Sequence, residues 1–179
     1  MFDRNYSETR EPRVPSMILE MLSHQNFRDM VLGHDPAFKF NLARAVYKGV
    51  LKYTSLQHET GYVVQPLPVT CFQTRLNAED QEITLSWSPR QDKLEPSASP
   101  KGYIVYTRRD HQDFDNGTFV EHPHFTLPAE ENVLYTFKVT AVNEGGESFP
   151  SEELSAMLAK NALANILIID GFQRVAGPQ

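Results

Sequence analysis

Cysteine, long apolar runs and excess positive charge are all scarce in this sequence of 179 residues. Cys71 is the single cysteine, which excludes an internal disulfide and a metal site built from several cysteines. We interpret it as a strand residue. No apolar run approaches the ~20 residues that span a bilayer, and the charged N-terminus is not followed by an apolar segment. We therefore expect no membrane partner.

The charge balance argues against a second class of partner. The formal net charge is -6 and the isoelectric point is near 5.5. A protein that binds nucleic acid neutralises phosphates with clustered lysine and arginine, and no such basic stripe is present. Hydrophobic residues make up 40% of the chain, which is enough for a core. The sequence therefore predicts a globular protein that does not bind nucleic acid.

Short alternating runs fill residues 66–160, with turn residues about every ten positions. In EITLSW, Ile83, Leu85 and Trp87 fall on one face of a strand. LYTFKVTAVN alternates in the same way and is followed by Gly145 and Gly146. Such a pattern is typical of an all-β sandwich. We also predict a tight type I′ hairpin at 116–117, because Asn-Gly suits the positive φ angles of that turn.

These strands resemble a fibronectin type III domain over about 66–160. The resemblance depends on Trp87, Tyr103, Val105, Leu127 before a proline, and the run that begins at Tyr135. It implies a structural role for Tyr135, whose hydroxyl would bond the preceding backbone at a corner of the sandwich. The predicted fold class is mainly β, a fibronectin type III (immunoglobulin-like) sandwich with an N-terminal strand-plus-helix fragment of an α/β domain.

The flanks differ in kind from the sandwich. An apolar stripe through Phe38, Leu42, Val46 and Val50 predicts a helix over about 36–54. Asp35 before a proline is a suitable N-cap. Residues 58–65 are interpreted as a linker. The run SMILEML at 16–22 suits either a helix or a fully buried parallel strand.

A second apolar run, ANILIIDGF, follows the sandwich and is interpreted as a strand buried on both faces. Residues 161–179 are accordingly predicted to begin a following domain. If 16–22 and 165–169 are both strands without neighbours, we expect the chain to associate with itself through them.

Residues 13–30 resemble the C-terminal end of a zinc-dependent N-acetylmuramoyl-L-alanine amidase domain. In that family a strand of proline, apolar residues and glutamate runs into a loop with serine and asparagine. By this resemblance Pro15 opens the strand, Glu20 is the catalytic carboxylate, and Ser23 and Asn26 lie in the loop. The chemistry implied is proton transfer by the carboxylate beside a zinc ion that polarises water and the amide.

The sequence departs from the family at two places. Met21 and Leu22 replace a glycine and an aromatic residue, and His24 and Gln25 separate Ser23 from Asn26. The family's zinc ligands, two histidines and a glutamate, come from earlier in the domain, so residues 1–57 are predicted to be its C-terminal fragment. We expect no cofactor and no hydrolysis in this chain alone, with zinc confined to an intact parent domain.

The arrangement as a whole resembles large secreted Bacteroidetes proteins, some of which are labelled xanthan lyase-related. It implies a secreted or periplasmic location, neighbouring domains as partners, and peptidoglycan or polysaccharide as the ligand. The favoured function is the non-catalytic portion of a cell-wall amidase-like protein, in which the fibronectin module is a spacer packed on the helix. The alternatives are a glycan- or protein-binding module and an accessory region of a polysaccharide lyase.

Three further features of the sequence are candidate sites. Glu20 and His24 have the i, i+4 spacing of a metal pair only if 16–22 is helical. His122 and His124 form a His-x-His pair, which Pro123 suggests is a solvated loop pair. A sugar-stacking platform would need exposed aromatic side chains, for which the candidates are Tyr106, Phe114, Phe119 and Phe125. The structural alternative is that these aromatic residues fill the sandwich core or a contact between domains.

Overall fold

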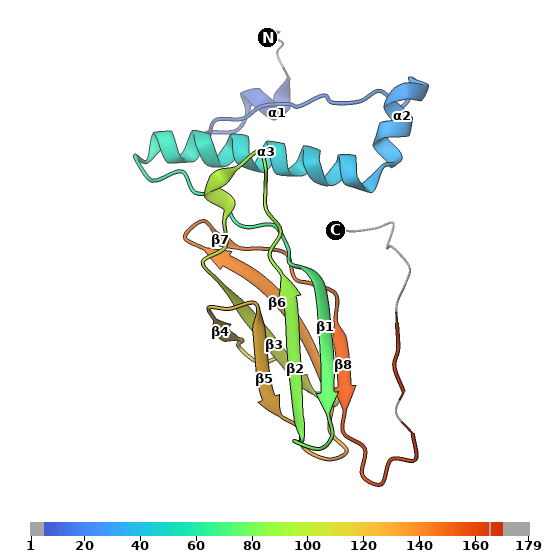
Figure 1. Cartoon of the computed structure of the whole chain (residues 1–179). Coiled ribbons are helices and arrows are strands. Elements are labelled where there is room, and N and C mark those ends of the chain that lie inside the picture. The colour runs from blue at the N-terminus through green and yellow to red at the C-terminus, as the bar shows by residue number, and fades with distance from the viewer. Residues whose placement is uncertain (1–5, 165, 170–179) are drawn as a thin grey trace.

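The computed structural model describes residues 6–164 and 166–169, and it shows a β-sandwich with a long helix lying across one end (Figure 1). The helices are α1 (Ser7–Arg10), α2 (Phe27–His34), α3 (Pro36–Gln57) and a 3-10 turn, η1 (Pro96–Ala98). The strands are β1 (Thr70–Asn77), β2 (Glu82–Ser88), β3 (Gly102–Arg109), β4 (Thr118–Val120), β5 (His124–Pro128), β6 (Leu134–Asn143), β7 (Gly146–Glu147) and β8 (Leu154–Met157).

The strands form two antiparallel sheets. One has the order β1-β2-β5, and the other has the order β4-β3-β6-β7, with β8 also paired to β6. The sandwich predicted for 66–160 is therefore confirmed. In the described part of the chain, no helix is long and apolar enough to cross a membrane.

The core lies between the sheets and follows the predicted alternation. Ile83, Leu85 and Trp87 of β2 face Tyr103 and its neighbours on the second sheet, all of them buried. The ring of Trp87 meets that of Tyr103 edge to face, with the centroids 5.3 Å apart. Because side chains alternate along a strand, every second residue enters this core.

The hairpin prediction at 116–117 was wrong. The connection between β3 and β4 is a longer loop, and Gly117 has a positive φ of 82° while Asn116 does not. The Asp115 carboxylate shapes the loop instead, because it accepts hydrogen bonds from the backbone N–H of Thr107 and of Gly117. An aspartate that bonds backbone two residues on is a turn former in its own right.

The predicted strand position of Cys71 is confirmed. Cys71 lies in β1 and is exposed. Its φ is 53°, and the pairing of β1 with β2 shifts register between Thr70 and Gln73. The residue therefore forms a β-bulge at the edge of the sheet.

The helix predicted for 36–54 is confirmed and continues to Gln57. The Asp35 side chain accepts a hydrogen bond from the N–H of Ala37, with Pro36 in the first turn, as the capping pattern predicted. After it, residues 58–65 form neither helix nor strand, but Val64 is fully buried, so this segment packs against the sandwich.

The structure bears out neither alternative for 16–22, helix or buried strand, and the buried strand predicted for the second apolar run was wrong in this chain. Residues 16–22 and 166–169 belong to no helix or strand, and their large apolar side chains are exposed. A fully buried strand needs partners on both edges and both faces, and no described residue supplies them. Of the domain predicted to begin at 161–179, position 165 and residues 170–179 lie outside the described residues.

Candidate interaction site at the helix junction

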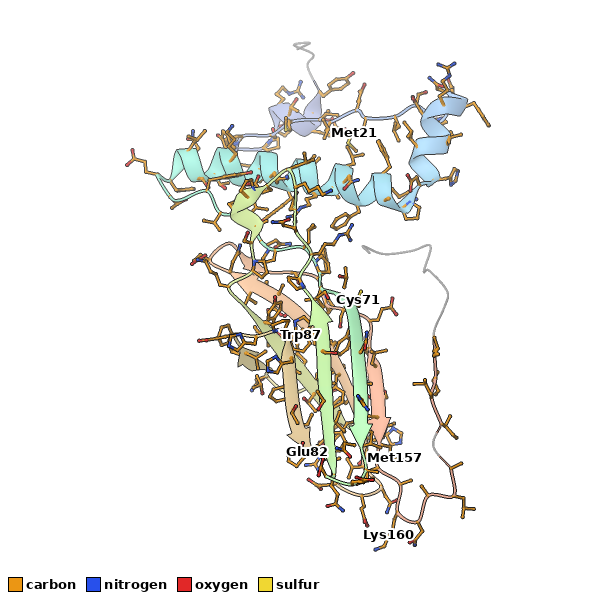
Figure 2. All side chains as sticks on the ribbon, viewed as in Figure 1. Met21, Cys71, Glu82, Trp87, Met157 and Lys160 are labelled. Carbon is orange, nitrogen blue, oxygen red and sulfur yellow. The ribbon has the colours of Figure 1, made fainter. Side chains whose placement is uncertain are left out.

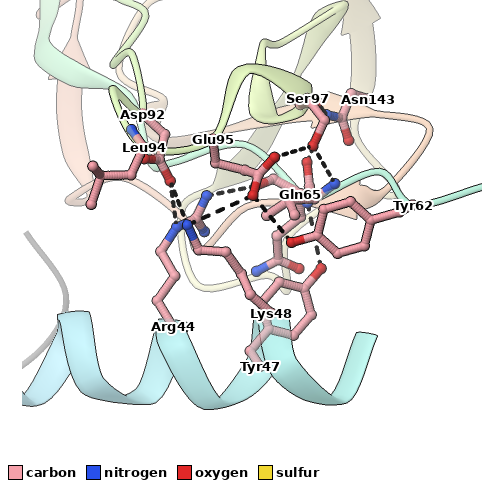
Figure 3. A network of polar contacts seen from close by, with 11 residues as sticks. Arg44, Tyr47, Lys48, Tyr62, Gln65, Asp92, Leu94, Glu95, Ser97 and Asn143 are labelled. Atoms are coloured by element: carbon pink, nitrogen blue, oxygen red, sulfur yellow. Dashed lines mark hydrogen bonds and ion pairs between the residues drawn. The ribbon is translucent and has the colours of Figure 1, made fainter. Parts of the chain in front are cut away.

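A network of polar contacts joins α3 to the sandwich, and Figure 3 shows it from close by. Arg44 and Lys48 are four residues apart and therefore point from the same face of α3. The Arg44 Nε donates to a carboxylate oxygen of Asp92 at 2.9 Å, and each of these side chains is only 10% exposed. The loop that carries Asp92 leads from β2 to η1. A nearly buried ion pair thus joins the helix to the sandwich.

A second cation reinforces this pair. The Lys48 Nζ lies 3.8 Å from carboxylate oxygens of both Asp92 and Glu95. A second Arg44 nitrogen donates to the backbone carbonyl of Gln65 at 3.1 Å. Tyr47, from the same face of α3, accepts a hydrogen bond from the Gln65 N–H at 3.4 Å. Three side chains on one face of α3 therefore reach the sandwich or the segment that leads into it.

Glu95 extends the network along the segment after α3. Its carboxylate accepts from the Tyr62 hydroxyl at 3.1 Å and from the Ser97 hydroxyl at 2.8 Å. The Ser97 oxygen in turn accepts from the N–H of Val64. The Asn143 amide, at the end of β6, donates to the carbonyls of Val64 and Ser97. The network links α3, residues 62–65, the loop of η1 and β6.

The electrostatics favour an ionised Asp92. Burial would by itself raise the pKa of the Asp92 carboxyl group, but hydrogen bonds from Arg44 and the Leu94 N–H, together with the charge of Lys48, outweigh it. The resulting pKa lies below the ordinary value of 3.8. Burial and the bond to Glu95 raise the pKa of Tyr62, which keeps its hydroxyl protonated as a donor. Both carboxylates of the junction therefore act as acceptors.

The apolar stripe of α3 points elsewhere. Val46, Val50 and Tyr53 are three and four residues apart, and each is exposed. On the other side of the helix Ser55 is buried near the sandwich, where its hydroxyl donates to the Gly61 carbonyl at 3.4 Å. The helix thus turns its polar face to the sandwich and its apolar face away. This orientation is the reverse of that in an ordinary surface helix.

The structure does not gather the residues carried over from the amidase resemblance into a site. Glu20 is exposed on the extended segment before α2. Asn26 caps α2, since its side chain accepts from the Arg28 N–H. The Ser23 N–H donates to Asp29. The loop residues are therefore engaged in starting α2, and no helix places Glu20 and His24 on one face.

The residues present do not fit the zinc ion that the amidase resemblance implies. Within 6–164 and 166–169, no three histidine, cysteine, aspartate or glutamate side chains lie together. Zinc in a catalytic site takes three protein ligands and an open position. The rings of His122 and His124 stack with centroids 5.9 Å apart, and both residues are exposed. They supply two ligands at most, so no zinc chemistry follows from the described residues.

The four candidate aromatics do not form one platform. Phe125 packs against the core, while Phe119 covers the backbone of Gly102. The faces of Tyr106 and Phe114 are taken by Lys138, whose Nζ lies 5.3 and 4.2 Å from the two ring centroids. A stacking surface for sugar rings needs open aromatic faces. The arrangement therefore favours the structural interpretation of these residues.

Sequence reasoning missed the Arg44–Asp92 pair. The two residues are 48 positions apart, and each belongs to a segment that looks solvated when considered alone. One signal was present: Arg44 and Lys48 interrupt a helix whose other faces are largely apolar. Two cations at i, i+4 spacing repel each other unless carboxylates face them. That spacing predicts an acidic partner without saying where it lies.

The chain is similar to parts of several solved structures. The chain resembles the titin kinase with its flanking domains (18% identity, TM-score 0.46), covering 54% of this chain and 18% of that one. It resembles the chicken CNTN1 FN1-FN3 domains with 20% identity and a TM-score of 0.46, covering 56% of this chain and 34% of that one. It resembles the C. elegans twitchin kinase region with 19% identity and a TM-score of 0.46, covering 54% of this chain and 17% of that one. The chain thus spans about a third or less of these structures. No curated protein matches it.

The comparison with family models covers the same part of the chain as the sandwich. The fibronectin type III model matches residues 67–157. These residues include all eight strands, the buried Trp87 and the corner tyrosine Tyr135. The chain therefore belongs to the fibronectin type III family, whose fold is an immunoglobulin-like β-sandwich.

Proposed function

We propose that this chain is a rigid spacer, in which the fibronectin type III sandwich holds a neighbouring domain in a fixed orientation through α3. The observation that carries the proposal is the buried ion pair between Arg44 and Asp92. A flexible linker allows two domains to rotate freely. A helix held by directional bonds to Asp92 and to both backbone groups of Gln65 cannot rotate without breaking them.

The exposed apolar stripe of α3 supports the presence of a neighbour. A helix that gives its polar face to the sandwich still has Val46, Val50 and Tyr53 to bury. Exposed apolar residues in a row mark an interface in most proteins. We propose that α3 completes the core of a second domain on this side, so that it belongs to both neighbours.

The resemblance of residues 13–30 gives this neighbour a chemical identity. We propose an amidase-like parent domain in a secreted or periplasmic protein that acts on peptidoglycan or a related polysaccharide, with this chain as its non-catalytic C-terminal portion. Glu20 would handle a proton only in that intact domain. The described residues provide no metal ligand set, so the function proposed for this chain itself is mechanical.

Hydrogen exchange tests the spacer role in the chain as it stands. Arg44→Met keeps the length of the side chain and removes its charge, which leaves Asp92 with Lys48 alone. We expect exchange of the α3 backbone amides to accelerate about tenfold or more, because local opening no longer breaks the ion pair.

The matched control removes a cation from an exposed pair. Lys101 lies 4.0 Å from Glu144, and both side chains are 68% exposed. We expect Lys101→Met to leave exchange in α3 unchanged. Equal exchange in the wild-type chain and in Arg44→Met would contradict the spacer proposal.

The amidase part of the proposal has a separate test in the parent protein. Glu20→Gln removes the carboxylate and keeps its shape. We expect release of peptide from muropeptides to fall by about 10² to 10⁴, the usual contribution of a positioned proton carrier. The zinc content of the parent protein should stay the same. Unchanged turnover would reject the role proposed for Glu20.

A further inference from the structure

We propose that two copies of this chain pair through the apolar segments at their opposite ends, with residues 166–169 of one copy forming a β-strand beside residues 17–22 of the other. The proposal starts from the second segment, which follows the sandwich. Ile166, Leu167, Ile168 and Ile169 are between 79% and 88% exposed. Four consecutive large aliphatic side chains in water are costly, so the segment needs a covering surface.

The first segment has the same character. Met17, Ile18, Leu19, Met21 and Leu22 are each at least 37% exposed on a stretch without helix or strand. This segment lies beside the exposed stripe of α3 rather than over the sandwich, and Figure 2 shows Met21 on the side of α3 away from the strands. A strand added here would be covered by side chains of the helix as well.

Both segments also have open backbones. In the part of the chain that the structure describes, no hydrogen bond involves the backbone N–H or carbonyl groups of residues 17–22 or of 166–169. An extended apolar stretch with unpaired backbone groups acts as a template for another strand. Each segment therefore offers the backbone partner that the other lacks.

The two segments of one copy cannot reach each other. Lys160 lies at the end of the sandwich far from α3, whereas Met21 lies beyond α3 (Figure 2). The ten residues of β6 span the sandwich with a length of about 33 Å, and α3 adds about 10 Å. The nine residues from Lys160 to Ile169 extend at most roughly 30 Å. Neither segment can therefore cover the other within one copy, whereas a second copy supplies the missing partner of both segments at once.

Charge and area are both compatible with a second copy. Residues 161–169 contain no charged residue and residues 14–22 contain only Glu20, so the net charge of -6 lies elsewhere. If the nine large apolar side chains of the two segments bury about 60 Å² each, a pair of copies buries roughly 1,100 Å². A specific interface should bury more than about 1,000 Å².

Reciprocal pairing satisfies all four segments at once. In an antiparallel dimer, the α3 end of each copy meets the far end of its partner, which closes the assembly with two-fold symmetry. The proposal does not depend on the spacer function. Failure of the Arg44 test leaves the dimer proposal intact, because that test concerns α3 within a single copy, whereas a neighbouring domain packed on residues 17–22 would exclude the dimer.

Sedimentation of the full chain over a broad concentration series tests the dimer. We expect a monomer–dimer equilibrium in the wild-type chain. Leu19→Asp and Ile168→Asp should each raise the apparent dissociation constant at least about tenfold, because each places an unpaired charge in the interface. Leu94→Asp is the matched control, since Leu94 is 87% exposed and lies in neither segment. Its dissociation constant should not change.

All three substitutions are outside the core, so circular dichroism should show the same fold in each variant. A wild-type chain that stays monomeric throughout would overturn the proposal. The proposal would also be overturned if neither Leu19→Asp nor Ile168→Asp changed the dissociation constant of the dimer. Larger open assemblies that only Leu94→Asp disperses would overturn it as well.

Disulfide trapping tests which segments meet. In a Cys71→Ser background, Leu19→Cys and Ile168→Cys chains are prepared separately, mixed and oxidised. We expect the mixed disulfide to form faster than either homodimer. Preferential formation of the two homodimers would overturn the pairing of 166–169 with 17–22.

Discussion

Tyr135 fixes the corner where the chain enters β6. Its hydroxyl accepts a hydrogen bond from the Glu130 N–H at 3.3 Å, which is the corner bond that the sequence resemblance implied. Its ring stacks on that of Phe137 with centroids 6.1 Å apart, and the Arg109 guanidinium lies over the Tyr135 ring, 5.4 Å from its centroid. The hydroxyl and the ring therefore make separable contributions to stability.

We expect Tyr135→Phe to lower the free energy of unfolding by about 1 kcal/mol, because only the hydrogen bond is lost. Tyr135→Ala should lower it by about 3 to 5 kcal/mol, since the buried ring leaves a cavity. Urea denaturation measures both values. Tyr53→Phe, on the exposed stripe of α3, is the control, and a loss there equal to that of Tyr135→Phe would contradict the corner role.

Tyr106 holds the short strand β7 to the outer face of its sheet. Its hydroxyl donates to a carboxylate oxygen of Glu147 at 2.7 Å, and the Thr140 hydroxyl donates to the same oxygen at 2.6 Å. The bond to Glu147 and partial burial raise the pKa of Tyr106 to about 12. Because the folded pKa lies above the ordinary 10.0, the hydrogen bond contributes its full share to folding stability below pH 10. This stability is lost as the pH rises through 12.

We expect one tyrosine of the folded chain to ionise near pH 12 through this contact. The difference in phenolate absorbance between the wild-type chain and Tyr106→Phe isolates its titration. Glu147→Gln removes the negative charge and should bring the midpoint down toward 10. A midpoint that Glu147→Gln leaves in place would show that Glu147 is not the cause.

At the level of helices and strands, the sequence predicted what depends on local pattern. Strict alternation places Ile83, Leu85 and Trp87 inward, and the Asp35 cap fixes the start of α3. The failures involve distant partners. Whether 16–22 pairs as a strand depends on neighbouring strands, and the loop before β4 depends on the reach of Asp115 to Thr107. Local propensity predicts neither the strand partners of 16–22 nor the contact of Asp115 with Thr107.

The contact of α3 with the sandwich should weaken in acid. Asp92 has a folded pKa below 3.8, so its ion pair contributes fully above that pH and is lost as the pH falls through the folded value. We expect Asp92→Asn to lower the free energy of unfolding by about 1 to 2 kcal/mol at neutral pH. This difference from the wild-type chain should shrink below pH 3.8.

Urea denaturation at several pH values measures the effect of Asp92→Asn. Asp113→Asn, in the exposed loop between β3 and β4, is the control and should give no difference at any pH. A gap between the wild-type chain and Asp92→Asn that stays constant down to strong acid would contradict the ionic account of the contact.

The helix and the sandwich form one elongated body in which the two sheets extend from α3 (Figure 1). Hydropathy predicts the helix but gives its orientation incorrectly, because an apolar stripe normally marks the side that packs on the nearest core. Here Arg44 and Lys48 face the sandwich, and their partners Asp92 and Glu95 come from a loop far along the chain. The candidate site could therefore not be assembled from the sequence.

Two optical probes report separately on the two parts of this body. Trp87, the single tryptophan, lies in the sandwich core, while α3 supplies most of the helical circular dichroism. We expect both signals to change together on heating, because the ion pairs join the parts. In Arg44→Met the helical signal should be lost several degrees before the tryptophan signal. Separate transitions in the wild-type chain would contradict this coupling.

The direction in which α3 faces also decides where the protein can be shortened. A cut within 58–65, at the boundary that family matching suggests, would remove Arg44 and Lys48 and leave Asp92 and Glu95 as two neighbouring carboxylates without counter-charges. Their mutual repulsion would loosen the end of an otherwise complete sandwich. The smallest well-behaved version of this protein should therefore begin no later than Asn26, although every strand lies after Val69.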